Sequence, residues 1–435
     1  MCIRDRHSTI YVREAYYEMF EIMLNGLEER RTKYRYLVLG SPGVGKSIFH
    51  AFCLYVLLQA GAPVYFVRRA HSALFLNGRV YKPLVPVHEC LLLTDHNVWF
   101  LYDSLERPPT LTDSPIGMMV FSPRRIYNSY MKELSCPPMY MPLWEFEELE
   151  VANSILPEGH LPYEELVKRY DLCGGVPRQI FEEHKVYLKT YKNAFASVRH
   201  MDKLKKLDIH LFNHRIFGAV VGQDLESYQV CFLSNRIACE VNEFWKEDRA
   251  ATVSRVVNAS YDCVVGALYG KIYEVITIDS LRDLTKITCV SLDESMAKDK
   301  VVKLKPKIPM EMFNCQTLKE VELRNRQVLW KPRSLTFPCI DALLMLPESK
   351  TAVGLQFTLS EKHPIPKKSL REINDYCLKK WGYEFVLVFV VPRKNYDDFQ
   401  KQKQTERVSR QNKEEDVDVP PRSEVPVKQF KLCID

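Results

Sequence analysis

Residues 40–47 have the types and spacing of a phosphate-binding loop, GxxxxGK[ST]. They are Gly40, Ser41, Pro42, Gly43, Val44, Gly45, Lys46 and Ser47. Glycines in such a loop let backbone N–H groups curl around a phosphate, and the N-terminus of the following helix adds the positive end of its dipole. Lys46 can then reach the β- and γ-phosphates, and the Ser47 hydroxyl can ligate Mg²⁺. The loop therefore predicts binding of a nucleoside triphosphate, ATP or GTP, together with Mg²⁺.

The segments on either side of the loop have the patterns that this chemistry requires. Residues 36–39 are a short apolar run typical of a buried strand, and residues 48–60 are long and apolar enough for a helix packed on a sheet. Residues 9–31 have apolar side chains at helical spacing, so a further helix is expected beside the loop. This strand–loop–helix order is the setting in which a phosphate-binding loop works.

A nucleotide site of this kind also needs an acidic residue at the end of a neighbouring strand to hold the Mg²⁺ and its water. Asp95 and Asp103 both follow apolar runs. Asp103 is preferred because its run, residues 98–102, is longer and richer in strand formers. Many ATPases place Glu directly after this Asp, whereas Ser104 follows here. Hydrolysis is therefore expected to be slow or to use another base.

Two other segments are candidates for sensing the γ-phosphate. Residues 117–121 form a strand pattern that ends at Ser122, where a polar group can approach the nucleotide. Residues 173–178 place a tight Gly-Gly turn before Pro177, which is expected at the first position of a helix, and Arg178 follows. Arg178 can report on bound phosphate from a helical lid. The alternative is an ordinary helix start followed by a solvated arginine.

A second group of polar residues lies far along the chain. Asp341 opens a strand-like run that ends at residue 346, and residues 351–360 form a second run. Gln356 and Thr358 are two residues apart in that run, so their side chains are expected on the same face of the strand. A helix over residues 367–380 and a buried strand over 385–391 complete an α/β unit.

Metal-dependent nucleases of the restriction-endonuclease type use this layout, with an Asp on one strand and an acidic-x-Lys triplet on the next. This chain has Gln356 and Thr358 where the acid and the lysine would be, so the ligand at Gln356 is uncharged. Glu274, on an upstream helix, can add a carboxylate. The alternative is an ordinary hairpin with one exposed Asp. The missing positive charge can come from Lys362, Lys367 or Lys368.

Composition limits the class of protein. The chain has 435 residues, of which 46% are apolar and 27% charged, as in globular proteins of two or three domains. Its 13 cysteines include no CxxC pair, which argues against a zinc ribbon and favours reduced thiols in an intracellular compartment. The net charge of +6 permits nucleic-acid binding without requiring it. No apolar stretch reaches the roughly 18–20 residues that a membrane span needs.

Strand patterns alternate with helical ones in the first third of the chain, which favours a three-layer α/β sheet. Those strands are expected at residues 36–39, 64–67, 98–102, 118–121 and 139–141. The predicted fold is a P-loop NTPase of the AAA or STAND type with a helical lid, followed by a restriction-endonuclease-like α/β domain. The expected boundaries are a non-native leader over 1–8, the NTPase core over 9–143, the lid over 144–208, the nuclease-like domain over 209–392 and a poorly ordered polar tail over 393–435.

These motifs together resemble the Crinkler and retrotransposon-hot-spot superfamily, which joins a P-loop NTPase to a restriction-endonuclease-like domain. The similarity extends from residues 10–13 to about residue 392. Its most telling segments are residues 39–47, 101–103, 173–178 and 356–365. The printed residues include no Crinkler-type translocation segment before the P-loop, so they do not themselves predict secretion.

The resemblance implies an intracellular protein, nuclear or cytoplasmic, and for a translocated effector the nucleus of the host cell. It implies Lys46, Ser47 and Asp103 as ligands of nucleotide and Mg²⁺, and Asp341 and Gln356 as ligands of a second Mg²⁺ or Mn²⁺.

Three functions follow from these predictions. The leading hypothesis is an ATPase that controls a nuclease acting on DNA or RNA. The alternative is a non-catalytic nucleotide-dependent switch that binds chromatin, nucleic acid or a protein. The third hypothesis, a small-molecule kinase, would leave about half the chain without an assigned function. Basic residues in the segments 298–307 and 367–371 are expected to contact nucleic acid. Nothing in the sequence predicts the oligomeric state.

Overall fold

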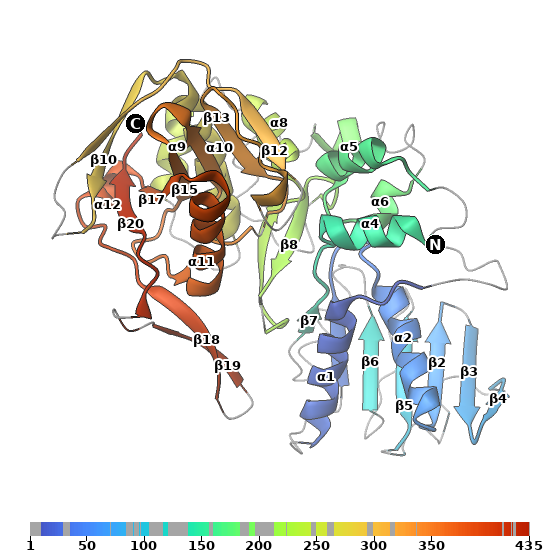
Figure 1. Cartoon of the computed structure of the whole chain (residues 1–435). Coiled ribbons are helices and arrows are strands. Elements are labelled where there is room, and N and C mark those ends of the chain that lie inside the picture. Colours follow the sequence, from blue (N-terminus) through green and yellow to red (C-terminus); the bar gives the residue numbers. More distant parts are fainter. Residues whose placement is uncertain are drawn as a thin grey trace. The chain divides into compact units, whose positions relative to one another are not determined.

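The computed structural model divides the chain into two compact units (Figure 1). Unit 1 comprises Met1–Leu233 with Cys263–Val265, and unit 2 comprises Ser234–Asp262 with Gly266–Asp435. The structure describes residues 10–28, 35–69, 71–83, 90, 95, 97–103, 116–120, 138–155, 160–182, 191–195, 213–222, 224–244, 249–258, 265–293, 299–313, 318–335, 337–410, 413–418, 420 and 423–434. No helix within these ranges combines the length and the apolar character needed to cross a bilayer.

Seven of the described strands of unit 1 form one sheet in the order β4-β3-β2-β5-β6-β1-β7. The strands β2, β5, β6, β1 and β7 are parallel, and β3 and β4 extend the sheet as an antiparallel hairpin. The bounds are β1 (Arg35–Leu39), β2 (Val64–Arg68), β3 (His71–Leu76), β4 (Arg79–Tyr81), β5 (Trp99–Asp103), β6 (Ile116–Val120) and β7 (Pro138–Tyr140).

The predicted α/β class is confirmed, and each of the five strands expected in this region has a counterpart shifted by at most two residues at either end. The β3–β4 hairpin was not predicted, because buried and exposed residues do not alternate regularly in β3 and every residue of β4 is exposed. Residues 124–134 also have a helical pattern in the sequence, and they lie outside the described residues.

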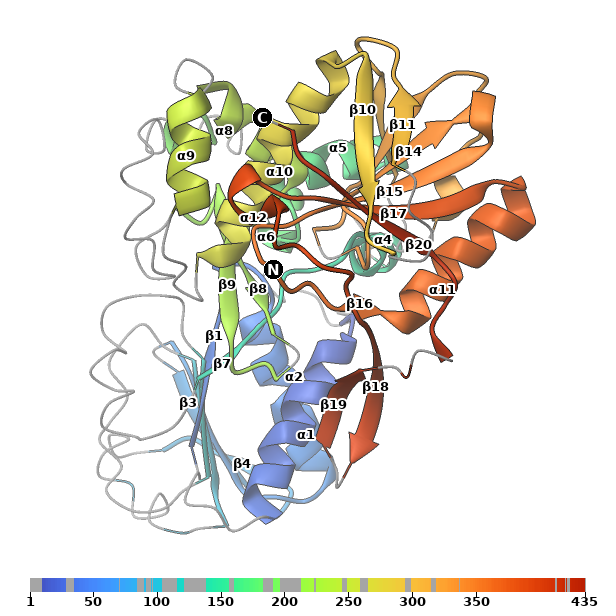
Figure 2. The ribbon, with the colours of Figure 1, turned by 90° about the vertical axis from the view of Figure 1, so that its left-hand side faces the viewer.

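Two helices cover one face of this sheet. Helices α1 (Glu14–Glu28) and α2 (Lys46–Gln59) lie on the same side of the strands in both views (Figures 1 and 2). The aromatic rings of Tyr16 and Phe49 join the two helices, with their centroids 5.4 Å apart. This packing fixes the start of α2, and therefore the end of the phosphate-binding loop, against α1.

Unit 1 continues with helices and a hairpin. The elements are α4 (Phe146–Ser154), α5 (Tyr163–Cys173), α6 (Pro177–Ile180), β8 (Phe217–Val221) and β9 (Tyr228–Phe232). The sequence predicted mostly helical structure over residues 144–208, and α4, α5 and α6 lie in the described part of that range. The β8–β9 hairpin lies before the division at Leu233, so it belongs to unit 1 and not to the nuclease-like domain that was predicted to begin at residue 209.

Eight of the described strands of unit 2 form a mixed sheet in the order β11-β10-β20-β17-β15-β14-β13-β12. Strands β15 and β17 are parallel and buried on both faces apart from Glu384, as is typical of central strands in α/β proteins. The bounds are β10 (Lys286–Ser291), β11 (Lys300–Lys303), β12 (Met310–Phe313), β13 (Val328–Pro332), β14 (Ala342–Leu346), β15 (Thr351–Phe357), β17 (Glu384–Val390) and β20 (Lys428–Leu432).

Helices cover both faces of this second sheet, as Figure 2 shows. Helix α11 (Lys367–Asp375) packs Leu370 and Ile373 into a core that includes Trp330 and Phe389. Helix α10 (Gly266–Asp283) lies on the opposite face together with α9 (Arg249–Asn258), and α8 (Asn235–Phe244) contacts α10. The remaining short elements are η6 (Leu318–Glu320), η7 (Pro347–Ser349), η8 (Tyr376–Trp381) and α12 (Arg393–Tyr396).

The prediction of a poorly ordered tail over residues 393–435 is wrong for the described part of that segment. Strand β20 pairs in parallel with β17 and antiparallel with β10, so the last strand of the chain lies inside the sheet. Strands β18 (Gln404–Arg410) and β19 (Lys413–Asp418) form a hairpin that pairs with β16 (Ile365–Pro366). Polar residues inside this segment are satisfied by one another: Gln429 Nε2 donates to the Gln402 carbonyl at 2.9 Å.

We expect unit 2 to depend on this last strand. Phe430 of β20 is 6% exposed and pairs with Val388 of β17, so Phe430→Ala should lower the free energy of unfolding by about 3–5 kcal/mol through the cavity it leaves. Lys428→Ala, in the same strand, removes only an exposed ion pair with Glu384 and should cost less than about 1 kcal/mol. Urea unfolding of both variants measures the difference; equal stabilities would show that β20 is not part of the folded sheet.

Candidate functional site

The predicted phosphate-binding loop lies at the carboxyl end of β1, directly before α2. Gly43 and Gly45 have φ values of 95° and 108°, a region that L-residues with side chains rarely adopt. A Cβ atom on Gly45 would lie 2.5 Å from the Tyr16 hydroxyl, so the close packing of α1 also requires glycine there. The loop therefore packs closely against α1 at Gly45, and its last two residues, Lys46 and Ser47, begin α2.

Lys46 is 5% exposed, and its side chain is folded back over the loop. Its Nζ donates to the carbonyl oxygens of Gly40 at 2.8 Å and Ser41 at 2.9 Å. Burial and the nearby charge of Arg178 lower the pKa of Lys46 to about 7, against an opposing effect of the Asp103 carboxylate. Lys46, Arg178 and Asp103 are therefore close enough to interact electrostatically, although they come from three separate segments.

Asp103 is the last residue of β5, and Asp95 precedes that strand. Because β1, β6 and β5 are parallel neighbours, Asp103 lies at the same edge of the sheet as the loop after β1. Asp95 lies at the opposite end of β5, is exposed, and accepts hydrogen bonds from the backbone and side-chain amides of Asn97 at 2.9 and 3.1 Å. The geometry thus supports the preference for Asp103. Ser104, Ser122 and residues 105–115 lie outside the described residues.

This geometry gives a testable ranking of the two acids. Asp103→Asn should slow Mg²⁺-dependent ATP hydrolysis at least ten-fold, which corresponds to about 1.4 kcal/mol of barrier, because a neutral amide holds the metal poorly. Asp95→Asn should change the rate little, since it alters only a surface turn. Phosphate release by the two variants measures the effect, and a slower Asp95→Asn enzyme would assign the magnesium ligand to Asp95.

Arg178 contacts the phosphate-binding loop directly. Pro177 occupies the first position of α6, as predicted, and the Arg178 backbone N–H donates to the Gly43 carbonyl over a long 3.5 Å. A Cβ atom on Gly43 would lie only 2.6 Å from Cβ of Arg178. The structure therefore places the backbone N–H and Cβ of Arg178 against the loop, while the residue as a whole is exposed to solvent.

The loop has the donors that a phosphate group needs. The Ser41 hydroxyl oxygen is buried, and the described residues supply it with no hydrogen-bond partner. The first N–H groups of α2 have no carbonyl to accept them within the helix, and Ser47 is the second residue of that helix. Oxygen ligands such as the Ser47 hydroxyl and the Asp103 carboxylate suit Mg²⁺. The residues present therefore fit a nucleotide phosphate with Mg²⁺.

The distal polar residues predicted in unit 2 also come together. Strands β14 and β15 are antiparallel, with Ala342 opposite Leu355, so Asp341 lies opposite Gln356. The Asp341 carboxylate accepts hydrogen bonds from Gln356 Nε2 and from the Phe357 backbone N–H, both at 2.8 Å. Thr358 takes no part in this contact: its hydroxyl accepts the Ser360 N–H at 3.1 Å and caps a turn.

Glu274, on α10, is paired with two lysines that sequence reasoning missed. Its two carboxylate oxygens lie 2.7 Å from Nζ of Lys271 and 2.7 Å from Nζ of Lys331, and Glu274 and Lys331 are almost fully buried. Lys331 is in β13, the strand beside β14. The sequence signal was a lysine inside the otherwise apolar run 328–332. Of the lysines that were predicted instead, Lys367 contacts Glu406 at 3.1 Å.

The charges of this cluster shift two carboxyl groups in opposite directions. Burial, followed by the charge of Glu274, raises the pKa of Asp341 to about 7, although Lys271, Lys331 and the Phe357 N–H oppose this rise. Burial acts in the same sense on Glu274, but Lys271 and Lys331 outweigh it and lower the pKa of that carboxyl. Glu274 is thus the ionised acid of the cluster, and Asp341 is its titratable neighbour.

This arrangement does not fit the divalent metal predicted at Asp341, Gln356 and Glu274. Both oxygens of Glu274 face ammonium groups, and Asp341 Oδ2 already accepts two hydrogen bonds. Gln356 presents its amide nitrogen, which cannot ligate a cation, to that carboxylate. Among the described residues, no three His, Cys, Asp or Glu side chains are grouped so as to hold a metal. The cluster is an ion-pair network in which lysines neutralise the acids.

One of the two basic segments predicted to contact nucleic acid, residues 298–307, lies partly in the edge strand of the unit 2 sheet. Lys300 and Lys303 lie in β11, the edge strand of the unit 2 sheet, where charged side chains also prevent pairing with other strands. Lys305 contacts Glu348 at 3.1 Å, and the two side chains are 62% and 69% exposed. Exposed pairs of this kind leave the lysines available to compete for phosphates.

No protein-family model matches the chain, and no solved structure matches it. It is 24% identical over 387 residues to Crinkler effector protein 15 of Phytophthora infestans, and 24% identical over 386 residues to Crinkler effector protein 16 of the same organism. Both alignments cover 83% of this chain, but it spans only 60% and 59% of the length of these relatives. The chain is therefore similar to Crinkler effector proteins over most of its length, which supports a Crinkler-like relationship.

Proposed function

We propose that this protein is an effector of the Crinkler type that binds a nucleoside triphosphate with Mg²⁺ in unit 1 and acts as a nucleotide-dependent switch. The observation that supports this most strongly is the packing of Arg178 against the loop that contains Lys46, with Asp103 at the same edge of the sheet. The similarity to Crinkler effector proteins supports the effector role, with action in the nucleus or cytoplasm of a host cell.

Each residue of the loop has a distinct part in this proposal. Ser47 and Asp103 would hold Mg²⁺, which when bound offsets negative charge on the β- and γ-phosphate oxygens. The ammonium of Lys46 exchanges the carbonyls of Gly40 and Ser41 for phosphate oxygens, so that the conformation of the loop depends on occupancy. Arg178 contacts the loop from α6 and passes that change to the helical segment of unit 1.

Unit 2 is proposed to be a nuclease-like module that binds nucleic acid, chromatin or a protein without cleaving phosphodiesters. The neutralisation of Glu274 by Lys271 and Lys331 favours this function over catalysis by a divalent metal. The competing function is a metal-dependent nuclease. It is favoured by one observation, the meeting of Asp341 and Gln356 at the end of β15 beside the charge of Glu274.

Two measurements on the full chain test the proposal. Calorimetric titration with Mg·ATP and Mg·GTP should show binding at one site and should show which base is preferred. Incubation with DNA and RNA, in Mg²⁺ or Mn²⁺ and with or without ATP, should show salt-sensitive binding and no cleavage. Cleavage that is lost in Asp341→Ala would establish the nuclease instead. Absence of nucleotide binding would reject the switch.

A further inference from the structure

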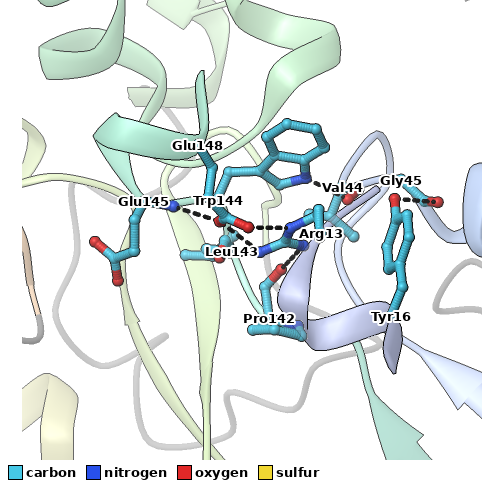
Figure 3. A network of polar contacts seen from close by, with 9 residues as sticks. All are labelled: Arg13, Tyr16, Val44, Gly45, Pro142, Leu143, Trp144, Glu145 and Glu148. Carbon is cyan, nitrogen blue, oxygen red and sulfur yellow. Dashed lines mark hydrogen bonds and ion pairs between the residues drawn. The ribbon is translucent and has the colours of Figure 1, made fainter. Parts of the chain in front are cut away.

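Three backbone carbonyls of the phosphate-binding loop are held from outside by other parts of unit 1, as Figure 3 shows for two of them. Trp144 Nε1 donates to the Val44 carbonyl at 2.7 Å, and the Tyr16 hydroxyl donates to the Gly45 carbonyl at 3.2 Å. The third is the long contact from the Arg178 N–H to the Gly43 carbonyl. Trp144 is buried and comes from the segment between β7 and α4, about 100 residues after the loop.

The direction of these bonds matters because a peptide unit is planar and trans. Its C=O and N–H groups therefore point in opposite directions. A donor that holds the Val44 carbonyl on the outer side of the loop turns the Gly45 N–H to the inner side. The Gly45 carbonyl accepts the Ile48 and Phe49 N–H groups of α2 as well as the Tyr16 hydroxyl, and this turns the Lys46 N–H away from the helix. These inner N–H groups are the ones that a phosphate-binding loop presents to its anion.

The indole of Trp144 is itself fixed by a buried arginine. Arg13 is 2% exposed and forms a two-pronged ion pair with Glu148 of α4, at 2.7 and 2.8 Å. It also donates to the carbonyls of Pro142 and Leu143, the two residues directly before Trp144, at 3.0 and 2.9 Å. The guanidinium carbon lies 4.8 Å from the centre of the Trp144 ring, within cation–π range.

A second contact holds the backbone of the same residue. The Trp144 N–H donates to the Gly175 carbonyl at 2.9 Å, and a Cβ atom on Gly175 would collide with Trp144. The indole therefore has little freedom to leave the Val44 carbonyl. The indole of Trp144 therefore orients the Val44 carbonyl in addition to packing in the core.

We propose that Trp144 is a positioning residue for phosphate binding, with Arg13 and Glu148 as its support. By holding the Val44 carbonyl outward, it keeps the Gly45 N–H directed to the phosphate before the nucleotide arrives. Tyr16 assists at the next peptide. This inference rests on the proposed nucleotide binding by unit 1, and it assigns part of the affinity to a residue outside the GxxxxGK[ST] motif.

The test is Trp144→Phe, which keeps an aromatic ring for Arg13 but removes the donor to Val44. We expect Mg·ATP to bind about ten-fold more weakly, the size expected when a buried carbonyl loses its donor. Inorganic pyrophosphate, which can be held only through its phosphate groups, should weaken by the same factor. Trp99→Phe is the matched control: it replaces a buried tryptophan of the same unit, in β5, and should leave both affinities unchanged.

A second pair of variants covers the case in which Trp144→Phe fails to fold. Tyr16→Phe removes the side-chain donor to the Gly45 carbonyl, which keeps the Ile48 and Phe49 N–H groups of α2 as donors, so it should weaken both ligands by a smaller factor than Trp144→Phe. Tyr36→Phe removes a bond to the Met23 carbonyl at 2.7 Å and should not weaken either ligand. Parental affinity in Trp144→Phe, or in Tyr16→Phe if the former is unfolded, overturns the inference while nucleotide binding stands. A parent protein that binds neither ligand overturns the proposed function and this inference with it.

Discussion

Lys46→Ala is expected to abolish measurable binding of Mg·ATP while the protein stays folded. Lys46 supplies the only lysine of the motif that can reach the β- and γ-phosphates, and no short side chain can replace its charge. In the nucleotide-free protein its ammonium is buried, and the lowered pKa shows that burial disfavours the charged form. Alanine removes that cost but leaves two loop carbonyls without their donor, so we expect the thermal midpoint without nucleotide to change little.

The measurement is titration with Mg·ATP alongside thermal unfolding with and without nucleotide. The parent should gain stability as nucleotide is added, since a ligand that binds only the folded state raises the midpoint. Lys46→Ala should show no such gain. Lys82→Ala, an exposed lysine of the same unit just after β4, is the matched control and should behave as the parent. Equal affinity in Lys46→Ala and the parent would refute the phosphate-binding assignment.

The second large effect is expected in unit 2. Glu274→Gln keeps the shape of the side chain but leaves Lys331 buried opposite a neutral amide. Removing one partner of a buried ion pair typically costs about 3–5 kcal/mol, because the remaining charge is no longer compensated. We therefore expect the unfolding midpoint to fall by on the order of 10 °C. Lys331 is 1% exposed, so solvent cannot take the place of the lost carboxylate.

A double variant separates this ion-pair role from a role in holding metal. Lys331→Met in the Glu274→Gln background removes the uncompensated charge and should recover at least half of the lost stability. Differential scanning calorimetry of the parent, the two single variants and the double variant gives the coupling between the residues. If Glu274→Gln were as stable as the parent and instead lost Mn²⁺ binding, Glu274 would be a metal ligand and the lysine network would be incidental.

The loop over residues 40–47 and its place between a strand and a helix could be predicted from the sequence, because the pattern that forms them is local. Residues 40–47 are contiguous, and the strand before them and the helix after them follow from short-range apolar patterns. Asp103 could be ranked above Asp95 for the same reason, since a strand that ends in an acid is visible in five residues. The pairing of Asp341 with Gln356 was also accessible, because two adjacent strands joined by a short turn have few alternative registers.

The outer support of the loop could not be predicted in this way. Trp144 and Arg13 are ordinary residues in the sequence, and they come together only because β7 pairs beside β1 and brings the segment before α4 to the loop. Lys331 meets Glu274 through packing of α10 on a sheet whose β13 was not predicted. In both cases the partners are separated by more than 50 residues, and no local pattern encodes which of many buried positions will face each other.

The last 43 residues are a second case in which the local sequence could not predict the structure. Their polar composition predicted disorder, because a segment with few apolar side chains cannot usually offset its loss of chain entropy. The local sequence determined only that residues 429–432 alternate between polar and apolar side chains. The tertiary structure decided the rest: β17 offers an unpaired edge, and β20 fills it between β17 and β10. Buried glutamines such as Gln404 and Gln429 are stable there because the fold supplies a hydrogen-bond partner for each amide, which composition alone does not reveal.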